Sequence, residues 1–148
     1  KAHKKPGAIL INDETRRWLM PSGYYVVTRR FSSKEERKRV VAHVFDPKEL
    51  PSEMVGFENH LNVFHKDKNG LDQETAYGLA LFLNSSVVDS HFRQFSGHTQ
   101  VNATDLRQMR YPSREQLRQF GRVAAVETLT QNRIDEIIDR AELNHGSE

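Results

Sequence analysis

The spacing of apolar positions changes near residue 72, and this change predicts two structurally different halves. Before that point, three runs rich in β-branched and aromatic residues, each bounded by turn-forming residues, indicate short strands at residues 24–31, 40–45 and 57–65. The links between these runs are short. We therefore expect neighbouring strands of one small sheet, mainly antiparallel.

Helical spacing dominates after residue 72. Asp72 is a suitable N-cap, and apolar residues then recur at every third or fourth position as far as Phe95. The polar triplet Asn84-Ser85-Ser86 interrupts this face, so the helix is expected to bend or divide there. A single helical turn is expected at residues 105–109, followed by a short extended segment that ends at Pro112.

Two further helices are predicted near the C-terminal end. Ser113 and Gln116 form a capping-box pattern that opens the first of them, and isoleucines at helical spacing mark the second. The fold class is therefore α+β, with the sheet in the first half and helices in the second. We expect one domain that consists of an N-terminal arm, a core and a pair of C-terminal helices, at residues 1–17, 18–112 and 113–148.

Composition places this chain of 148 residues among polar globular proteins, with 36% hydrophobic and 28% charged residues. The absence of cysteine excludes a disulfide framework and a thiolate nucleophile, and it fits a cytoplasmic location. No segment has the length of a transmembrane helix and no signal peptide is visible, so no membrane partner is expected. The chain begins at Lys1, which suggests a piece of a longer protein.

Positive charge is concentrated in one region although the formal net charge is only +2. Between residues 28 and 40, Glu35 and Glu36 stand among six basic residues: Arg29, Arg30, Lys34, Arg37, Lys38 and Arg39. Such side chains on a strand end and the following turn suit phosphate oxygens. Alternatively, the charges pair among themselves on a solvated turn. The residues alone leave both interpretations open.

A polar loop follows the long predicted helix and offers hydrogen-bonding side chains, namely Ser96, His98, Thr99, Gln100 and Asn102. Donors and acceptors of this kind serve recognition when a rigid scaffold positions them. The structural alternative is a turn at Gly97, after which Asn102 begins a short helix.

Most enzymatic sites are disfavoured by what the chain lacks. No two glycines lie within five residues of each other, which excludes the common glycine-rich phosphate loops. The pair His60 and His65 has no carboxylate in register and is a poor metal site. Glu36 and Lys38 match a fragment of a nuclease motif, which would require an aspartate such as Asp13 to converge with them. We expect no catalytic residue and no metal in this chain.

Three segments resemble the C-terminal target-recognition region of adenine-specific DNA methyltransferases of type II restriction–modification systems, in the TaqI-methylase-like class. They are RFSSKEERKRVVAHVFDP (residues 30–47), GFENHLNVFH (56–65) and LALFLNSSVVDSHFRQFSGHTQVNATDLRQMRYP (79–112). The third is long and idiosyncratic, which makes the resemblance specific. A looser version is similar to specificity subunits of type I restriction enzymes.

The resemblance implies a recognition module without its catalytic partner. Members of the family transfer a methyl group from S-adenosylmethionine to N6 of adenine, using a glycine motif and an Asn/Asp-Pro-Pro-Tyr/Phe tetrapeptide. This chain has neither, since no two of its prolines are adjacent. The implied partners are double-stranded DNA and a catalytic methyltransferase domain of the same polypeptide. S-adenosylmethionine is implied for the full-length enzyme only, and the chain should not methylate DNA alone.

Side-chain chemistry then suggests two groups of DNA contacts. Amides suit adenine and arginines suit guanine, so the candidates for base reading are Arg29, Arg30, His98, Gln100 and Asn102. The candidates for phosphate contact are Lys34, Arg37, Lys38 and Arg39. Two other functions stay open. Half of a type I specificity subunit would have long terminal spacer helices, and a protein-interaction module would expose an apolar stripe between residues 116 and 141.

Overall fold

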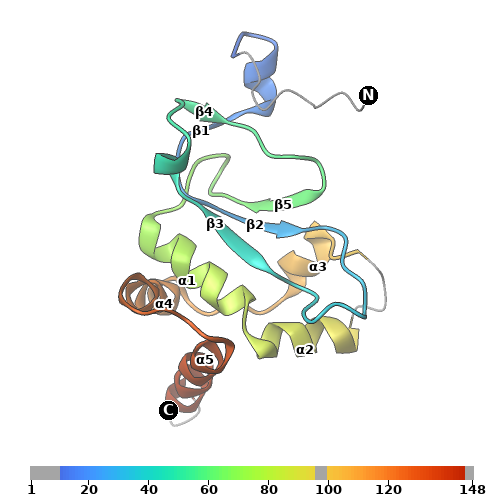
Figure 1. Cartoon of the computed structure of the whole chain (residues 1–148), viewed down its shortest axis with the longest axis vertical. Coiled ribbons are helices and arrows are strands. Elements are labelled where there is room, and N and C mark those ends of the chain that lie inside the picture. Colours follow the sequence, from blue (N-terminus) through green and yellow to red (C-terminus); the bar gives the residue numbers. More distant parts are fainter. Residues whose placement is uncertain (1–10, 96–99, 146–148) are drawn as a thin grey trace.

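The computed structural model describes residues 11–95 and 100–145 of the chain (Figure 1). The strands are β1 (Met20–Pro21), β2 (Tyr25–Arg29), β3 (Ala42–Phe45), β4 (Met54–Val55) and β5 (Leu61–Phe64). The helices are α1 (Gln73–Leu83), α2 (Ser86–Phe95), α3 (Ala103–Gln108), α4 (Arg114–Val126) and α5 (Gln131–His145). Two 3-10 turns, η1 (Thr15–Trp18) and η2 (Pro47–Glu49), complete the order. The expected α+β class is confirmed.

The three predicted strands form one antiparallel sheet in the order β3-β2-β5, so β2 is central. Val26 of β2 lies opposite Val44 of β3 and Phe64 of β5, and all three pack into the core. The other face of the sheet carries Val27 and the exposed His43, and it lies away from the helices (Figure 1). A second antiparallel pair, β1 with β4, was not predicted from the pattern.

Helix α1 lies between the sheet and the C-terminal helices and supplies much of the core (Figure 1). Its contact with α4 brings the two backbones unusually close. A Cβ atom added at Gly78 would overlap the carbonyl oxygen of Leu117, and one added at Gly121 would overlap the carbonyl oxygen of Glu74. Only glycine fits at these two crossing points.

The predicted interruption at residues 84–86 is confirmed, because α1 ends at Leu83 and α2 begins at Ser86. The Asn84 side chain pairs with the free edge of β3: its Oδ1 accepts from the Ala42 N–H at 2.8 Å, and its Nδ2 donates to the Ala42 oxygen at 3.0 Å. The Ser86 hydroxyl donates to Asp135 of α5 at 2.6 Å. The interruption therefore links the sheet, α2 and α5.

The predicted helices after Pro112 are also confirmed. The Ser113 N–H donates to Gln116 Oε1 at 2.9 Å, and the Gln116 N–H donates to Ser113 Oγ at 3.2 Å, which is the expected capping box. The apolar faces of α4 and α5 pack into the core, and Leu117, Phe120, Ile134 and Ile138 are buried there. This finding opposes a protein-interaction module, which requires that stripe to be exposed.

Tyr111 fixes α3 against the rest of the molecule. Its hydroxyl donates to the Leu106 carbonyl oxygen at 2.7 Å, and its ring packs against Phe64 of β5 and Phe82 of α1. Burial raises the pKa of the Tyr111 hydroxyl to about 12, so it stays a donor at neutral pH. Helix α3 therefore has a set position beside the outer edge of β5. No helix in the described part of the chain is long and apolar enough to cross a membrane.

Candidate nucleic-acid interface

The basic segment between β2 and β3 (residues 32–39) is held by one arginine of α2. Arg93 Nε donates to Asp89 Oδ2 at 2.8 Å within the helix. Its two Nη atoms donate to three backbone oxygens of the segment, those of Lys34, Glu36 and Arg37, at 3.0, 2.7 and 3.2 Å. A planar guanidinium can satisfy several acceptors at once, which an ammonium cannot. The path of the basic segment therefore depends on Arg93.

Replacing Arg93 with alanine is expected to release this segment and to lower the free energy of unfolding by about 1 kcal/mol, because the bonds are charge-assisted but partly exposed. Backbone amides of residues 34–37 should exchange with solvent faster, which hydrogen-exchange mass spectrometry can follow. Arg93→Lys should give an intermediate result. Unchanged exchange in Arg93→Ala would contradict this account of the segment.

The surroundings of Arg39 do not suit the expected role of this side chain as a phosphate contact. It is only 2% exposed, and its Nε donates to Ser32 Oγ at 2.9 Å inside the segment. Its backbone N–H donates to Asp89 Oδ1 at 2.7 Å. Because a buried guanidinium cannot reach a phosphate, we assign Arg39 a structural role. A double substitution of Arg37 and Arg39 would therefore affect folding as well as binding.

Lys38 is half-buried and also engaged within the fold. Its Nζ donates to the Asn84 carbonyl oxygen and to Gln131 Oε1, each at 3.0 Å. Burial lowers the pKa of the Lys38 ammonium, and the carboxylates of Asp89 and Asp135 oppose this shift. Lys38 joins the segment to the break between α1 and α2. Of the four phosphate candidates, Lys34 and Arg37 have exposed side chains.

The base-reading candidates have different surroundings. Arg29 is exposed at the end of β2, with Nη2 at 3.7 Å from Glu36 Oε1. Arg30 is exposed and donates from Nη1 to the Asn59 carbonyl oxygen at 3.1 Å. Gln100 is half-buried and forms an isolated bridge with Phe31.

Asn102 stands at the N-cap of α3, where the structural interpretation of the polar loop places it, and its N–H donates to Asp105 Oδ2 at 3.3 Å. His98 lies outside the described residues, as does the turn at Gly97. The structure therefore describes four of the five candidates for base reading.

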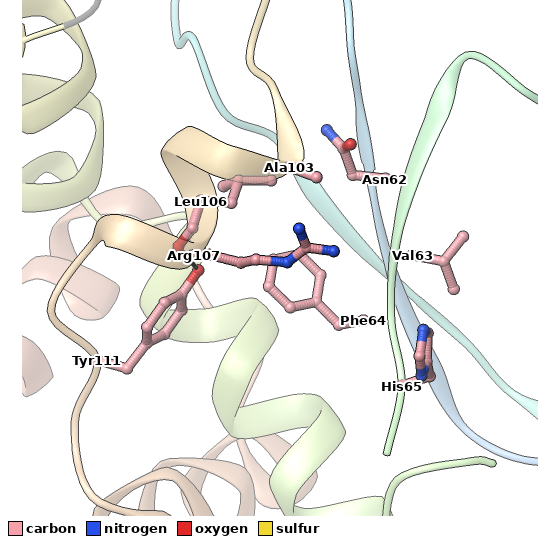
Figure 2. Close-up of a pocket in the computed structure, with 8 residues that line it drawn as sticks. All are labelled: Asn62, Val63, Phe64, His65, Ala103, Leu106, Arg107 and Tyr111. Carbon is pink, nitrogen blue, oxygen red and sulfur yellow. Dashed lines mark hydrogen bonds between the residues drawn. The ribbon is translucent and has the colours of Figure 1, made fainter. Parts of the chain in front are cut away.

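Two adjoining cavities form a groove along the outer edge of β5, with volumes of about 400 and 520 Å³. Both are lined by Asn62, Val63, His65 and Ala103. We call this region the β5 groove. Figure 2 shows the smaller cavity, where the Arg107 side chain extends from α3 toward β5. The groove thus lies between α3 and the edge strand of the sheet.

Three segments are tied together at one end of this groove. The buried Asn62 side chain donates to the Val101 carbonyl oxygen at 2.8 Å, and the Val101 N–H donates to the Arg30 carbonyl oxygen at 2.7 Å. These bonds join β5, the segment before α3 and the end of β2. The N-terminus of α3, including Ala103, is thereby placed at the groove.

The N-terminal turn η1 supplies the far wall of the larger cavity. Asn12 Oδ1 accepts from the Thr15 N–H at 2.9 Å and so shapes the turn, while Arg16 pairs with Glu53 at 3.6 Å. Arg17 and Trp18 then line the groove, and Trp18 is 70% exposed. An exposed indole beside cations offers a flat apolar surface on which a sugar or base can pack.

The charged side chains that line the β5 groove are mainly positive. The described lining residues include the cations Arg17, Arg30, Lys68 and Arg107, and among them Glu58 carries the one carboxylate, which contacts His60 Nδ1 at 2.7 Å. Within residues 11–95 and 100–145, no carboxylate forms an ion pair with any of these four cations.

The arginines of the helices differ from the groove cations, because most of them form ion pairs with carboxylates. Ion pairs of 2.8 to 3.9 Å involve Arg93, Arg114, Arg118, Arg122, Arg133 and Arg140. Among the exposed cations without a carboxylate partner in the described part of the chain, four line the β5 groove and two, Lys34 and Arg37, lie on the basic segment, while Lys48, Lys66 and Arg110 lie outside both.

Arg30 is the only groove cation that was a candidate from the sequence; Arg17, Lys68 and Arg107 were missed, as was Trp18. A partial signal existed for Arg107, which has no acidic residue three or four positions away on its short helix. Nothing comparable marks Arg17 or Lys68. Their importance appears only when distant segments are brought to one groove.

A metal-dependent nuclease and a type I specificity subunit find no support in the geometry. No group of three or more His, Asp or Glu side chains in the described part of the chain could hold a metal ion, as such a nuclease would require. Helix α4 ends at Val126 after 13 residues, a length that does not suit the long spacer helix of a type I specificity subunit.

Comparison with known proteins gives one consistent result. The chain is 50% identical over 146 residues to the type II methyltransferase M.BsuBI of Bacillus subtilis, and 46% identical over 138 residues to the type II methyltransferase M.PstI of Providencia stuartii. These matches include 97% and 93% of this chain, but only 29% and 27% of the relatives. No protein-family model and no solved structure matches it. The chain is thus homologous to one part of type II methyltransferases.

Proposed function

We propose that this chain is the module that recognises double-stranded DNA in a type II, adenine-specific methyltransferase of a restriction–modification system. The cations of the β5 groove carry the proposal, because none of them has a carboxylate partner in the described part of the chain and each can offer its charge to a phosphate without breaking such an ion pair. The homology to part of type II methyltransferases supports it.

In this proposal, different residues hold the DNA backbone and read the bases. Arg17, Arg30 and Arg107 contact phosphates at the groove and set the position of the duplex. Lys34 and Arg37 extend the basic surface beyond it.

The candidates for base reading are Arg29, Gln100 and Asn102, and His98 stays a candidate from the sequence. Arg30 was also a base-reading candidate from the sequence, and it is assigned to phosphates in this proposal because it lines the groove. A bidentate contact from an arginine to guanine, or from an amide to adenine, discriminates by about 1–3 kcal/mol.

The chemistry of methyl transfer is assigned to another domain of the same polypeptide. The residues of this chain do not fit S-adenosylmethionine or the transfer step, since the glycine motif and the Pro-Pro tetrapeptide are absent. An adenine that receives a methyl group at N6 has to leave the base stack. We propose that this module holds the surrounding duplex while the catalytic domain receives that base, in a cytoplasmic enzyme.

The test is fluorescence-anisotropy binding of the chain to a random-sequence duplex at two salt concentrations, with single-stranded RNA of equal length as the competing ligand. We expect duplex binding that exceeds RNA binding and weakens steeply as salt rises. Absence of duplex binding at low salt, or a preference for the RNA, would contradict the proposal.

A further inference from the structure

The turn between β5 and α1 has an unusual backbone. Lys66 and Asn69 exchange two hydrogen bonds, N–H to oxygen in each direction, both of 2.9 Å. The two residues between them, Asp67 and Lys68, have φ angles of 51° and 63°. A two-residue turn with positive φ at both central positions is the type I′ turn. They are the only non-glycine residues with positive φ in the described ranges, 11–95 and 100–145.

Lysine is a poor choice for the second central position. Glycine is preferred there because a Cβ atom is crowded in the left-handed region, whereas the short aspartate side chain at the first position is better tolerated. Asn69-Gly70, the pair that favours this turn, follows immediately in the sequence. The chain therefore carries a suitable pair but does not use it at the turn.

Gly70 is needed for packing. A Cβ atom at Gly70 would lie 2.9 Å from the Gly23 Cα atom and 3.1 Å from the Tyr24 nitrogen, so the two backbones meet at this point. The Leu71 N–H then donates to the Tyr24 carbonyl oxygen at 2.8 Å. The turn consequently falls on residues 67–68. This packing explains the place of the turn, but it does not explain a lysine there.

The Lys68 side chain provides an explanation. It lines the larger cavity of the β5 groove and has no carboxylate partner in the described part of the chain. The Lys68 N–H also donates to His65 Nδ1 at 2.9 Å, an arrangement that leaves the imidazole proton on Nε2. His65 lines both cavities of the groove. The same strained turn thus positions two donors for an anion.

We infer that Lys68 is a phosphate contact for duplex DNA, and that the left-handed backbone at this residue is retained because it presents the ammonium to the β5 groove. Local strain of this kind persists where the surrounding structure enforces it, often at binding sites. The inference rests on the proposed function and deepens it, because it assigns the backbone of one turn to DNA binding.

The test compares Lys68→Gly with Lys68→Arg by thermal unfolding and by duplex anisotropy. Glycine removes both the strain and the charge, so Tm should rise by about 3 °C while affinity falls about fivefold near physiological salt. The slope of log affinity against log salt should shrink by about 0.9, the value for one phosphate contact. Arginine keeps the charge and the strain, so both measurements should stay close to the wild-type values.

Lys66→Ala is the matched control, because Lys66 is exposed in the same turn but does not line the groove. Its affinity should stay close to wild type. If Lys68→Gly raised Tm but bound like wild type, or if Lys66→Ala lost as much affinity as Lys68→Gly, the inference would be overturned. Failure of the wild-type chain to bind any duplex would instead defeat the proposed function itself, and the two failures are distinguishable.

Discussion

Gly78→Ala is expected to lower the free energy of unfolding by about 3 kcal/mol or more, a large part of the stability of an ordinary domain. The added Cβ atom would meet the backbone carbonyl of Leu117, and a backbone carbonyl cannot rotate aside as a side chain can. Helices α1 and α4 would have to separate, which would disrupt the core that α1 shares with the sheet. Urea unfolding followed by circular dichroism measures the effect.

Gly56→Ala is the control for this experiment. The new Cβ atom there would lie 2.8 Å from Leu19 Cδ2, the end of a flexible side chain that can shift. We expect a change in unfolding free energy of less than about 1 kcal/mol. Gly121→Ala should resemble Gly78→Ala, because it faces the Glu74 carbonyl oxygen from the other helix. Equal stability of all three variants would show that the α1 and α4 backbones are not in close contact.

Replacing Arg17, Arg30 and Arg107 together with glutamine should weaken duplex binding about a hundredfold near physiological salt, because three phosphate contacts would be lost. The slope of log affinity against log salt should shrink by about 3. Folding should be little affected, since none of these arginines takes part in an ion pair in the described part of the chain. Anisotropy titration at several salt concentrations measures both quantities.

A matched variant separates local contact from overall charge. In this second variant, glutamine replaces three arginines of α4 and α5, namely Arg122, Arg133 and Arg140, so the net charge changes by the same amount as in the first. These arginines already pair with carboxylates of the helices, so duplex affinity should change only slightly. Equal losses in the two triple variants would mean that net charge alone governs binding. Loss in neither would move the interface to Lys34 and Arg37.

The elements of the fold were largely predictable because they depend on local patterns. Runs rich in β-branched and aromatic residues placed the three strands of the main sheet, and helical spacing placed α1 and α2 together with the break at residues 84–86. The capping box at Ser113 and Gln116 marked the start of α4 correctly. Each of these signals lies within a few residues of the element it describes, so no knowledge of distant neighbours is needed.

The tertiary structure decided which charged side chains are bonded within the fold and which are exposed. Arg39 and Lys38 belong to the same basic run as Lys34 and Arg37, yet contacts from α2, α5 and the break after α1 draw the first two into the fold. Charge alone could not separate these pairs. Whether a cation is free for an outside anion depends on which carboxylates, carbonyl groups and apolar surfaces surround it.

The β5 groove could not be predicted from the sequence either, because its cations come from four separate parts of the chain: Arg17, Arg30, Lys68 and Arg107. No two are close enough in sequence to form a motif. The sequence determined the three strands of the main sheet, the helices and an overall excess of positive charge through short-range patterns. The tertiary structure decided which charges are paired, buried or gathered at one groove, because electrostatic and packing interactions act between neighbours in space.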